Sequence, residues 1–366
     1  MAGSGFGTNF RITTWGETHG AGVGVVVDGC PAGLPLERED VQKYLDRRKP
    51  GQSKYTTQRK EGDQVEILSG IFEGRTTGTP ISMVVYNKDQ RSKDYSNIKD
   101  IYRPGHADFT FDMKYGFRDY RGGGRSSGRE TIGRVAAGAV AAKVLKELGI
   151  EIKAYAKAIA GIEVSKDHFD FAEMNNNPFN MPDKEAAKLV QEKADQMIKE
   201  MDSIGGIIEC QITGMPVGIG ETVFDKLDAE LSKAIMSIGS VKGFEIGDGF
   251  EAANLRGSEI NDDFICVDGK VEKETNHSGG VLGGMSDGSA IVFRAAIKPT
   301  PSIAQTQKTV NRDLDNVEIE IHGRHDPMIV PRAVVVVESM AAVTILDGVL
   351  KNLGATMDNI KKIYGE

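Results

Sequence analysis

A segment rich in glycine and arginine, residues 121–131, holds the residue types best suited to bind an anion. It reads Arg-Gly-Gly-Gly-Arg-Ser-Ser-Gly-Arg-Glu-Thr, so guanidinium and hydroxyl groups are concentrated in one short stretch. Glycine lets backbone N–H groups approach a ligand without an intervening Cβ. A guanidinium donates a planar pair of hydrogen bonds to phosphate or carboxylate oxygens. The segment therefore predicts an anion site, and the alternative is a solvated basic loop.

The residues after this segment predict a buried helix over 131–148. Positions 135–142 contain only Val, Ala and Gly, and such small side chains indicate close packing. Lys143 and Lys146 suit the negative end of the helix dipole, and Gly149 is a typical helix end. An anion bound by residues 121–131 would then face a helix N-terminus, where free N–H groups favour negative charge.

Histidine is scarce, so the position of each of the six histidines is informative. His19, His106 and His325 each lie among Gly, Pro, Arg or Asp, in sequence typical of loops. An imidazole there can exchange a proton near neutral pH, and the alternative is a structural histidine. A metal site of His322, His325 and Asp326 is disfavoured because glycine and proline interrupt that segment. We expect no metal.

Length and composition are those of an ordinary soluble globular protein. The chain has 366 residues, 39% hydrophobic and 27% charged, enough for one large domain or two closely packed ones. A net charge of −8 disfavours nucleic-acid binding. Basic residues nevertheless concentrate in two early groups, the pattern expected of a pocket for a small polyanion: Arg47, Arg48, Lys49, Lys54, Arg59 and Lys60, and then Arg103, Lys114, Arg118, Arg121, Arg125, Arg129 and Arg134.

The cysteines and the apolar segments point to a cytoplasmic protein. Cys30, Cys210 and Cys266 are odd in number and widely spaced, so each is expected to be a small core residue rather than part of a disulfide. The N-terminus has no secretory pattern. The apolar segment 333–350 carries two carboxylates and is interpreted as a buried helix, so no membrane partner is expected.

Periodicity predicts an α+β fold rather than a doubly wound sheet, because helices and strands mix without a regular βαβ rhythm. No internal repeat stands out. Residues 87–130, 239–263 and 270–289 are the long polar loops, a length that usually indicates function. Helices are predicted at 38–48, 131–148, 182–204, 227–237 and 332–352, and strands at 22–28, 64–70, 81–86, 150–157, 207–213, 290–297 and 317–322.

Two common nucleotide-binding patterns are absent from the sequence. Neither a phosphate-binding loop of the Gly-x-x-x-x-Gly-Lys-Ser/Thr type nor a Gly-x-Gly-x-x-Gly after a strand is present. A bound cofactor phosphate would need another cradle. The candidates are residues 125–127, residues 298–302 and the glycine-rich segment 279–284, which is alternatively a packed turn.

Several segments together resemble those of the chorismate synthase family, in the family's order and over nearly the whole chain. The most specific are 16–20 (Gly-Glu-Thr-His-Gly), 121–131, 298–300 (Lys-Pro-Thr) and 323–327 (Gly-Arg-His-Asp-Pro). Segments 56–59, 102–108 and 241–247 resemble the family as well. The resemblance implies an anti-1,4-elimination of phosphate from 5-enolpyruvylshikimate 3-phosphate. Chorismate is formed in the shikimate pathway of aromatic amino acid biosynthesis, and reduced FMN is required without net redox change.

The resemblance also implies a single catalytic domain over 1–366, with mixed helices and antiparallel strands in a layered sandwich core and long glycine-rich active-site loops. It further implies a homotetramer and a set of site residues. His106 resembles the general acid for the departing phosphate, His19 the residue that protonates reduced flavin, and Asp326 the carboxylate that assists at the flavin N5. The residues implied to contact FMN are Arg125, Ser126, Ser127, Gly239, Ser240, Gly283, Lys298, Pro299, Thr300, Pro301, Ser302 and Arg324. Those implied to contact the anionic substrate are Thr18, Arg48, Lys54, Arg129 and Arg134.

Two residue roles and two competing functions stay open at this point. Arg134 is equally interpreted as a surface salt-bridge residue of its helix. Lys54 stands where an arginine is often linked to NADP, so NADPH as a reductant is left undecided. The competing functions are an RNA- or phosphate-binding module that uses the glycine-arginine segment, and a flavin oxidoreductase with net hydride transfer.

Overall fold

Two antiparallel sheets form the outer layers of the protein. The computed structural model describes residues 3–57, 61–88, 99–321 and 326–365. The first sheet has the order β1-β2-β3-β7-β4 and the second the order β11-β16-β10-β8-β9. Their bounds are β1 Gly5–Phe6, β2 Arg11–Gly16, β3 Gly22–Asp28, β4 Val65–Ile67 and β7 Ile81–Tyr86, and β8 Glu151–Ile159, β9 Ile162–Glu163, β10 Gly206–Thr213, β11 Val241–Ile246 and β16 Ile291–Ile297.

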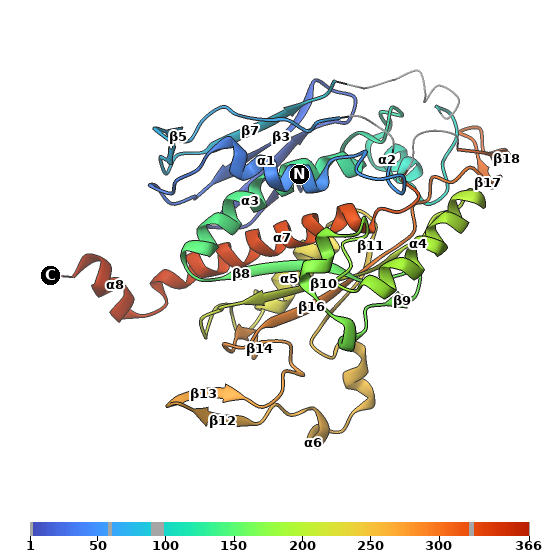
Figure 1. Ribbon diagram of the computed structural model, residues 1–366. Coiled ribbons are helices and arrows are strands. Elements are labelled where there is room, and N and C mark those ends of the chain that lie inside the picture. The colour runs from blue at the N-terminus through green and yellow to red at the C-terminus, as the bar shows by residue number, and fades with distance from the viewer. Residues whose placement is uncertain (1–2, 58–60, 89–98, 322–325, 366) are drawn as a thin grey trace.

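Helices fill the space between the two sheets, so the layers run sheet, helix, helix, sheet (Figure 1). Helix α3 (Thr131–Glu147) packs against the first sheet, and α7 (Val330–Lys351) packs against both α3 and the second sheet. Helix α1 (Arg38–Arg48) contacts α3 and β4, and α5 (Leu227–Met236) contacts α7 and β11. This arrangement confirms the predicted α+β layered sandwich.

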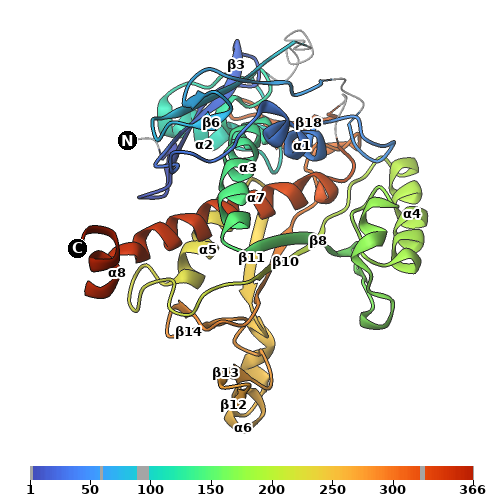
Figure 2. The same cartoon turned by 60° about the vertical axis from the view of Figure 1, so that its left-hand side comes forward.

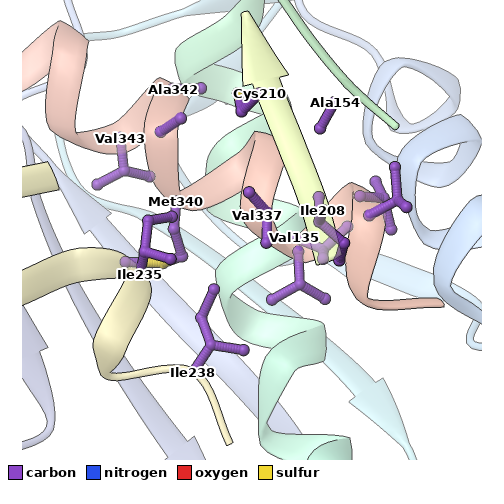
Figure 3. Packing of buried hydrophobic residues seen from close by; sticks show 14 of the residues in the cluster. Val135, Ala154, Ile208, Cys210, Ile235, Ile238, Val337, Met340, Ala342 and Val343 are labelled. Carbon is purple, nitrogen blue, oxygen red and sulfur yellow. The ribbon is translucent and has the colours of Figure 1, made fainter. Parts of the chain in front are cut away.

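Buried residues of both sheets and of the helices between them form one hydrophobic cluster. Figure 3 shows its part around α7, where Ile208 of the second sheet lies beside Val337 of α7 and Val135 of α3. Where α3 crosses α7 the two backbones come very close: a Cβ added at Gly138 would lie 2.2 Å from the Ser339 Cβ and 2.8 Å from its carbonyl oxygen. The small side chains seen in the sequence of α3 are therefore required by this crossing.

Smaller elements decorate the sandwich and carry most of the long connections. An arm built from residues 247–280 projects away from the body (Figure 2). The remaining helices are α2 Asp108–Tyr115, α4 Lys184–Lys199, α6 Gly257–Ile260 and α8 Met357–Tyr364. The hairpins are β5 Ile71–Phe72 with β6 Arg75–Thr76, β12 Phe264–Val267 with β13 Lys270–Lys273, β14 Val281–Leu282 with β15 Met285–Ser286, and β17 Gln307–Val310 with β18 Asn316–Ile319.

The two halves of the chain have the same topology, although no repeat was expected from the sequence. In each half, two neighbouring strands are followed by a helix, an edge strand, a short hairpin, a central strand and a long buried helix. These elements are β2, β3, α1, β4, β5–β6, β7 and α3 in the first half, and β8, β10, α5, β11, β14–β15, β16 and α7 in the second. Both sheets arrange the corresponding strands in the same order.

Most predicted elements are confirmed, and the errors fall at identifiable places. Helix α4 is shorter than the predicted 182–204. It begins after Asp183, whose Oδ1 accepts from the first-turn amides, and it ends before Met201, whose φ is +55°. The chain turns there, so Ile204 does not belong to the apolar stripe of the helix. Helix α2 within 87–130 was missed because its apolar side chains are mostly exposed.

Cys266 was wrongly predicted to be a core residue: it is exposed on β12, whereas Cys30 and Cys210 are buried. Helix α7 is long and apolar enough to cross a membrane by length and composition. However, 78% of its apolar window is buried inside the protein, as predicted for a core helix.

Candidate active site

The glycine-arginine segment leads directly into α3, as predicted. Gly122, Gly123 and Gly124 all have positive φ angles, which favour glycine, and short 3₁₀ turns then join the loop to Thr131. The Arg125 guanidinium points to β2, where it donates to the Thr14 carbonyl at 3.1 Å and the Gly16 carbonyl at 3.2 Å. These bonds fix the loop against the first sheet.

A buried charge cluster joins two of the predicted substrate arginines. Asp63 has a fully buried side chain, and it accepts from Arg48 Nη1 and from Arg129 Nη1, both at 2.8 Å. Glu61 is a second partner of Arg129. Burial lowers the pKa of Arg48 to about 10. The nearby Arg332 and Arg129 also lower this pKa, whereas the Asp63 carboxylate raises it. Its guanidinium therefore remains charged at neutral pH.

Arg134 belongs to a different network from Arg129. It pairs with Glu130 at 2.9 Å and donates to Ser237 Oγ, after α5, at 2.6 Å. Glu130 also accepts from Thr14 Oγ1 at 2.8 Å, next to Arg125. The structure thus groups Arg134 with Arg125 and places Arg129 with Arg48.

His106 lies where the two long loops of the two halves meet. Its Nε2 lies 2.9 Å from Ser302 Oγ, and its Nδ1 lies 2.9 Å from the Pro104 carbonyl. The carbonyl can only accept, so Nδ1 carries the proton of the neutral ring and Nε2 faces Ser302. Burial lowers the pKa of His106 and the Arg103 guanidinium lowers it further, so that it stays below its usual value despite the Pro104 bond.

The segment 298–302 is held from several sides. Lys298 Nζ donates to the Gly105 carbonyl at 3.0 Å, and its amide donates to Ser240 O at 2.9 Å. Ser203 Oγ donates to the Thr300 carbonyl at 2.6 Å. The Thr300 hydroxyl is buried, and it has no hydrogen-bond partner among the described residues. A buried hydroxyl without a partner is costly, so this one is suited to hydrogen-bond a polar ligand bound at segment 298–302.

The turn that carries Thr18 and His19 packs on the glycine-arginine loop. Both residues are buried, and a Cβ at Gly122 would lie 2.9 Å from His19 Nε2. Thr18 Oγ1 lies 3.5 Å from the Gly124 carbonyl. Glycine at 122 therefore serves to let the histidine approach the loop backbone.

Asp326 is bound through both carboxylate oxygens. Oδ1 accepts from the Thr57 amide at 2.7 Å, and Oδ2 accepts from Arg332 Nη1 at 2.6 Å. Arg332 also donates to the Arg48 carbonyl at 3.0 Å. Asp326 therefore adjoins the buried charge cluster.

Some of the predicted site residues lie apart from these groups. Gly283 forms the turn of the β14–β15 hairpin, before β16, whereas Lys298 follows the other end of that seven-residue strand. At about 3.3 Å per residue, roughly 20 Å of strand separates them within one chain. Lys54 pairs with Asp195 of α4 at 2.8 Å and is mostly exposed. Arg324 and His325, together with His322, Arg59 and Lys60, lie outside the described residues.

Several polar residues that complete the site were not predicted. Asp63, Asn87, Glu130 and Arg332 each hold one or more of the predicted residues. Asp63 has a left-handed backbone, with φ of +41°, but nothing in the sequence pattern indicates this conformation. Partners so distant along the chain become visible only when the loops are assembled.

The layered fold brings buried arginines, a lysine and histidines together in a candidate site whose positive charge suits a small anion. Residues 10–350 match the family described as chorismate synthase. A chorismate synthase of Lachnospira eligens is 67% identical over 364 residues, covering 100% of both chains, and one of Chloroflexus aggregans is 56% identical over 352 residues, covering 96% of each. A solved structure, "Crystal Structure of Chorismate Synthase", matches with a TM-score of 0.77 at 31% identity, covering 98% of this chain and 96% of its own. The chain belongs to the chorismate synthase family, which confirms the resemblance.

Proposed function

We propose that this enzyme converts 5-enolpyruvylshikimate 3-phosphate into chorismate and inorganic phosphate by an anti-1,4-elimination, with the whole of 1–366 acting as one catalytic domain. The observation that supports this most directly is the meeting of loops from both halves. Gly105 and His106 contact Lys298 and Ser302, while Asp326 adjoins the cluster of Arg48. These segments carry the residues whose family roles fit the reaction.

The arginines of the buried cluster are suited to the substrate, which carries two carboxylates and a phosphate. Arg48 and Arg129 are buried and pre-oriented by Asp63, so little side-chain freedom remains to be lost when an anion binds. Fixed donors in a site of low dielectric stabilise charge more than mobile surface donors do. We assign these two residues to the substrate anions.

His106 is suited to protonate or hydrogen-bond the departing phosphate. The pKa of this imidazole lies below its usual value in the free protein, because of burial and Arg103. A phosphate placed beside Nε2 acts in the opposite direction, since a neighbouring negative charge favours the imidazolium. The arrival of substrate would therefore charge the ring at the point where the leaving group needs a proton.

Reduced FMN is the implied cofactor, and segment 298–302 fits a flavin phosphate or ring edge. It offers the Lys298 ammonium, the unsatisfied Thr300 hydroxyl and Ser302, close to the backbone of Ser240. When bound, reduced FMN lends electron density to the substrate during the elimination. Asp326 and His19 are assigned to holding protons beside it. Arg125, Ser126 and Ser127 would orient its other side.

An anaerobic assay tests this proposal. The purified chain is mixed with chemically reduced FMN and 5-enolpyruvylshikimate 3-phosphate, and chorismate and phosphate are measured together. We expect the two products in equal amounts, and no turnover with oxidised FMN. Absence of chorismate would reject the function, and consumption of one NADPH per product would favour the flavin oxidoreductase instead.

We also propose a cytoplasmic homotetramer, as the family resemblance implies. In such an assembly Gly283, which lies far from Lys298 within one chain, would be free to serve another copy's site. Light scattering on the purified chain gives its mass directly. A monomeric mass would reject the proposed tetramer and would leave the proposed reaction unaffected.

A further inference from the structure

Asn87 stands at the junction of two segments that carry different predicted roles. It follows β7 directly, and its backbone amide donates to the Ala21 carbonyl at 3.0 Å. Its side-chain Nδ2 donates to the carbonyls of Glu17 and Gly20, both at 2.9 Å. These two carbonyls begin and end the turn that carries Thr18 and His19. The carboxamide therefore closes this turn.

The same carboxamide also holds a substrate arginine. Arg129 Nε donates to Asn87 Oδ1 at 2.7 Å, while Arg129 Nη1 donates to Asp63 at 2.8 Å. The partners determine the orientation of the amide, because two carbonyls require its N–H₂ group and a guanidinium requires its oxygen. Only asparagine combines two donors and an acceptor in so short a side chain.

The turn also contacts the glycine-arginine loop. His19 packs on Gly122, and Thr18 Oγ1 lies 3.5 Å from the Gly124 carbonyl. Asn87 is a second support, made through the turn's backbone carbonyls. Loss of its donors would remove the hydrogen bonds that link this turn to the partner of Arg129.

We propose that Asn87 is a positioning residue that couples the turn of His19 to Arg129, so that the histidine and the substrate arginine keep one fixed spacing. It does not itself touch the reacting atoms. This inference rests on the proposed function for its kinetic consequences, but the placement of His19 can be measured without turnover.

Replacement by aspartate separates the two contacts. In Asn87→Asp the carboxylate still accepts from Arg129, but it can no longer donate to Glu17 O and Gly20 O and instead repels both carbonyls. We expect kcat to fall about 10²-fold, because a displacement near 1 Å at a catalytic group has that effect. The KM for the substrate should change less than kcat, since Arg129 retains its partner. Asn87→Ala removes both contacts, so we expect it to lower kcat and raise KM together.

Asn177 offers a matched control for the same chemical change. Its Nδ2 also donates to two backbone carbonyls, those of Glu173 at 2.7 Å and Met181 at 2.8 Å, in the connection before α4. Asn177→Asp therefore causes a similar loss of turn-closing bonds away from the proposed site. We expect it to lower thermal stability while kcat and KM stay close to those of the wild type.

Histidine NMR supplies the readout that does not depend on activity. In protein labelled with ¹³C and ¹⁵N histidine, the His19 ring signals are assigned by their loss in His19→Gln and recorded at one pH. We expect Asn87→Asp and Asn87→Ala to shift these signals and Asn177→Asp to leave them in place.

Wild-type kcat and an unshifted His19 signal in folded Asn87→Asp would overturn the proposal, as would an equal loss of kcat in Asn177→Asp. If Asn87→Asp does not fold, the same outcomes are judged on Asn87→Ala, which introduces no charge. A wild-type chain that makes no chorismate would reject the proposed function instead, and the NMR comparison would still decide the placement of His19.

Discussion

A buried hydroxyl fastens the short hairpin to a proline-containing turn in each half of the chain. Thr76 of β6 does this in the first half, and Ser286 of β15 does it in the second. Each hydroxyl accepts from one backbone amide and donates to one carbonyl. The partners are Leu34 N at 3.0 Å and Pro31 O at 2.6 Å for Thr76, and Ile219 N at 2.9 Å and Pro216 O at 2.6 Å for Ser286.

The glycines of the two hairpins correspond in the same way. Gly70, Gly74 and Gly78 of the first half and Gly280, Gly284 and Gly288 of the second are equally spaced, and all have positive φ. A left-handed backbone at these turns favours glycine. The scaffold of both halves is therefore stabilised by the same local chemistry.

The connections between corresponding elements differ, and the candidate site lies in several of them. The β2–β3 turn is short and carries His19, whereas the β8–β10 connection contains α4. The β4–β5 connection is short, whereas the β11–β14 connection forms the projecting arm (Figure 2). The two long loops before α3 and α7 both contribute to the candidate site. The two halves thus share one scaffold, and the loops in which they differ carry most residues of the candidate site.

The largest expected effect is on turnover when a loop residue is removed. His106→Ala should lower kcat by about 10²–10⁴-fold, the usual contribution of a general acid, while FMN binding and stability are retained. Anaerobic kinetics with saturating reduced FMN measure this. His168→Ala, at an exposed site, is the control. Near-wild-type turnover in His106→Ala would remove this residue from the mechanism.

The next effect is on stability, at a charge cluster that joins loops of the first half. Asp63→Asn leaves Arg48 and Arg129 buried without their shared carboxylate, so we expect about 3–5 kcal/mol lower free energy of unfolding. Urea denaturation measures it. Asp46→Asn, which affects a half-exposed pair with Lys49, should cost less than about 1 kcal/mol. Equal losses would show that the cluster is not structurally special.

A smaller and symmetrical effect tests the correspondence of the two halves. Thr76→Val and Ser286→Ala each remove a hydroxyl that satisfies a buried amide and a carbonyl, and each should cost about 1–3 kcal/mol. Both should leave kcat nearly unchanged. The exposed Thr77→Val serves as control. A large loss of stability in one variant and none in the other would show that the two hydroxyls do not play corresponding roles in the two halves.

The smallest effect is local and depends on pH. At the base of the arm, Asp262 pairs with Lys273 at 3.0 Å. Burial alone would raise the pKa of Asp262, but hydrogen bonds from Ser278, Thr275 and His277 outweigh it and hold the pKa well below its usual value. The stabilisation is thus present above the unfolded-state pKa near 3.8 and is lost as pH falls below it.

Hydrogen exchange at pH 5 and pH 3 should therefore show the arm loosening before the sandwich does. In the Asp262→Asn variant, we expect the amides of the arm to exchange faster than in the wild type already at pH 5. An arm that exchanges identically in both proteins at both values would contradict the role of this ion pair.

Local sequence determined much of the scaffold. Helix α1 and strands β3 and β7 occur at the predicted residues, because their apolar periodicity and flanking turn residues act over a few positions. The glycine-arginine loop and its helix were likewise expected, since the backbone freedom of glycine and the charge of arginine are properties of the residues themselves. The predicted helix boundaries were wrong where a single side chain sets the helix end. One example is the start of α4, which Asp183 caps.

Only the tertiary structure decided which functional groups share a network. The sequence grouped Arg129 with Arg134 as neighbours on the substrate side, but the fold pairs Arg129 with Asp63 and Asn87 and turns Arg134 toward Ser237. Likewise Asp326, Arg332 and Arg48 come together from opposite ends of the chain. Hydrogen bonds and ion pairs act over about 3 Å in space. Their partners therefore follow from the packing of the two sheets and the loops between them, not from distance along the chain.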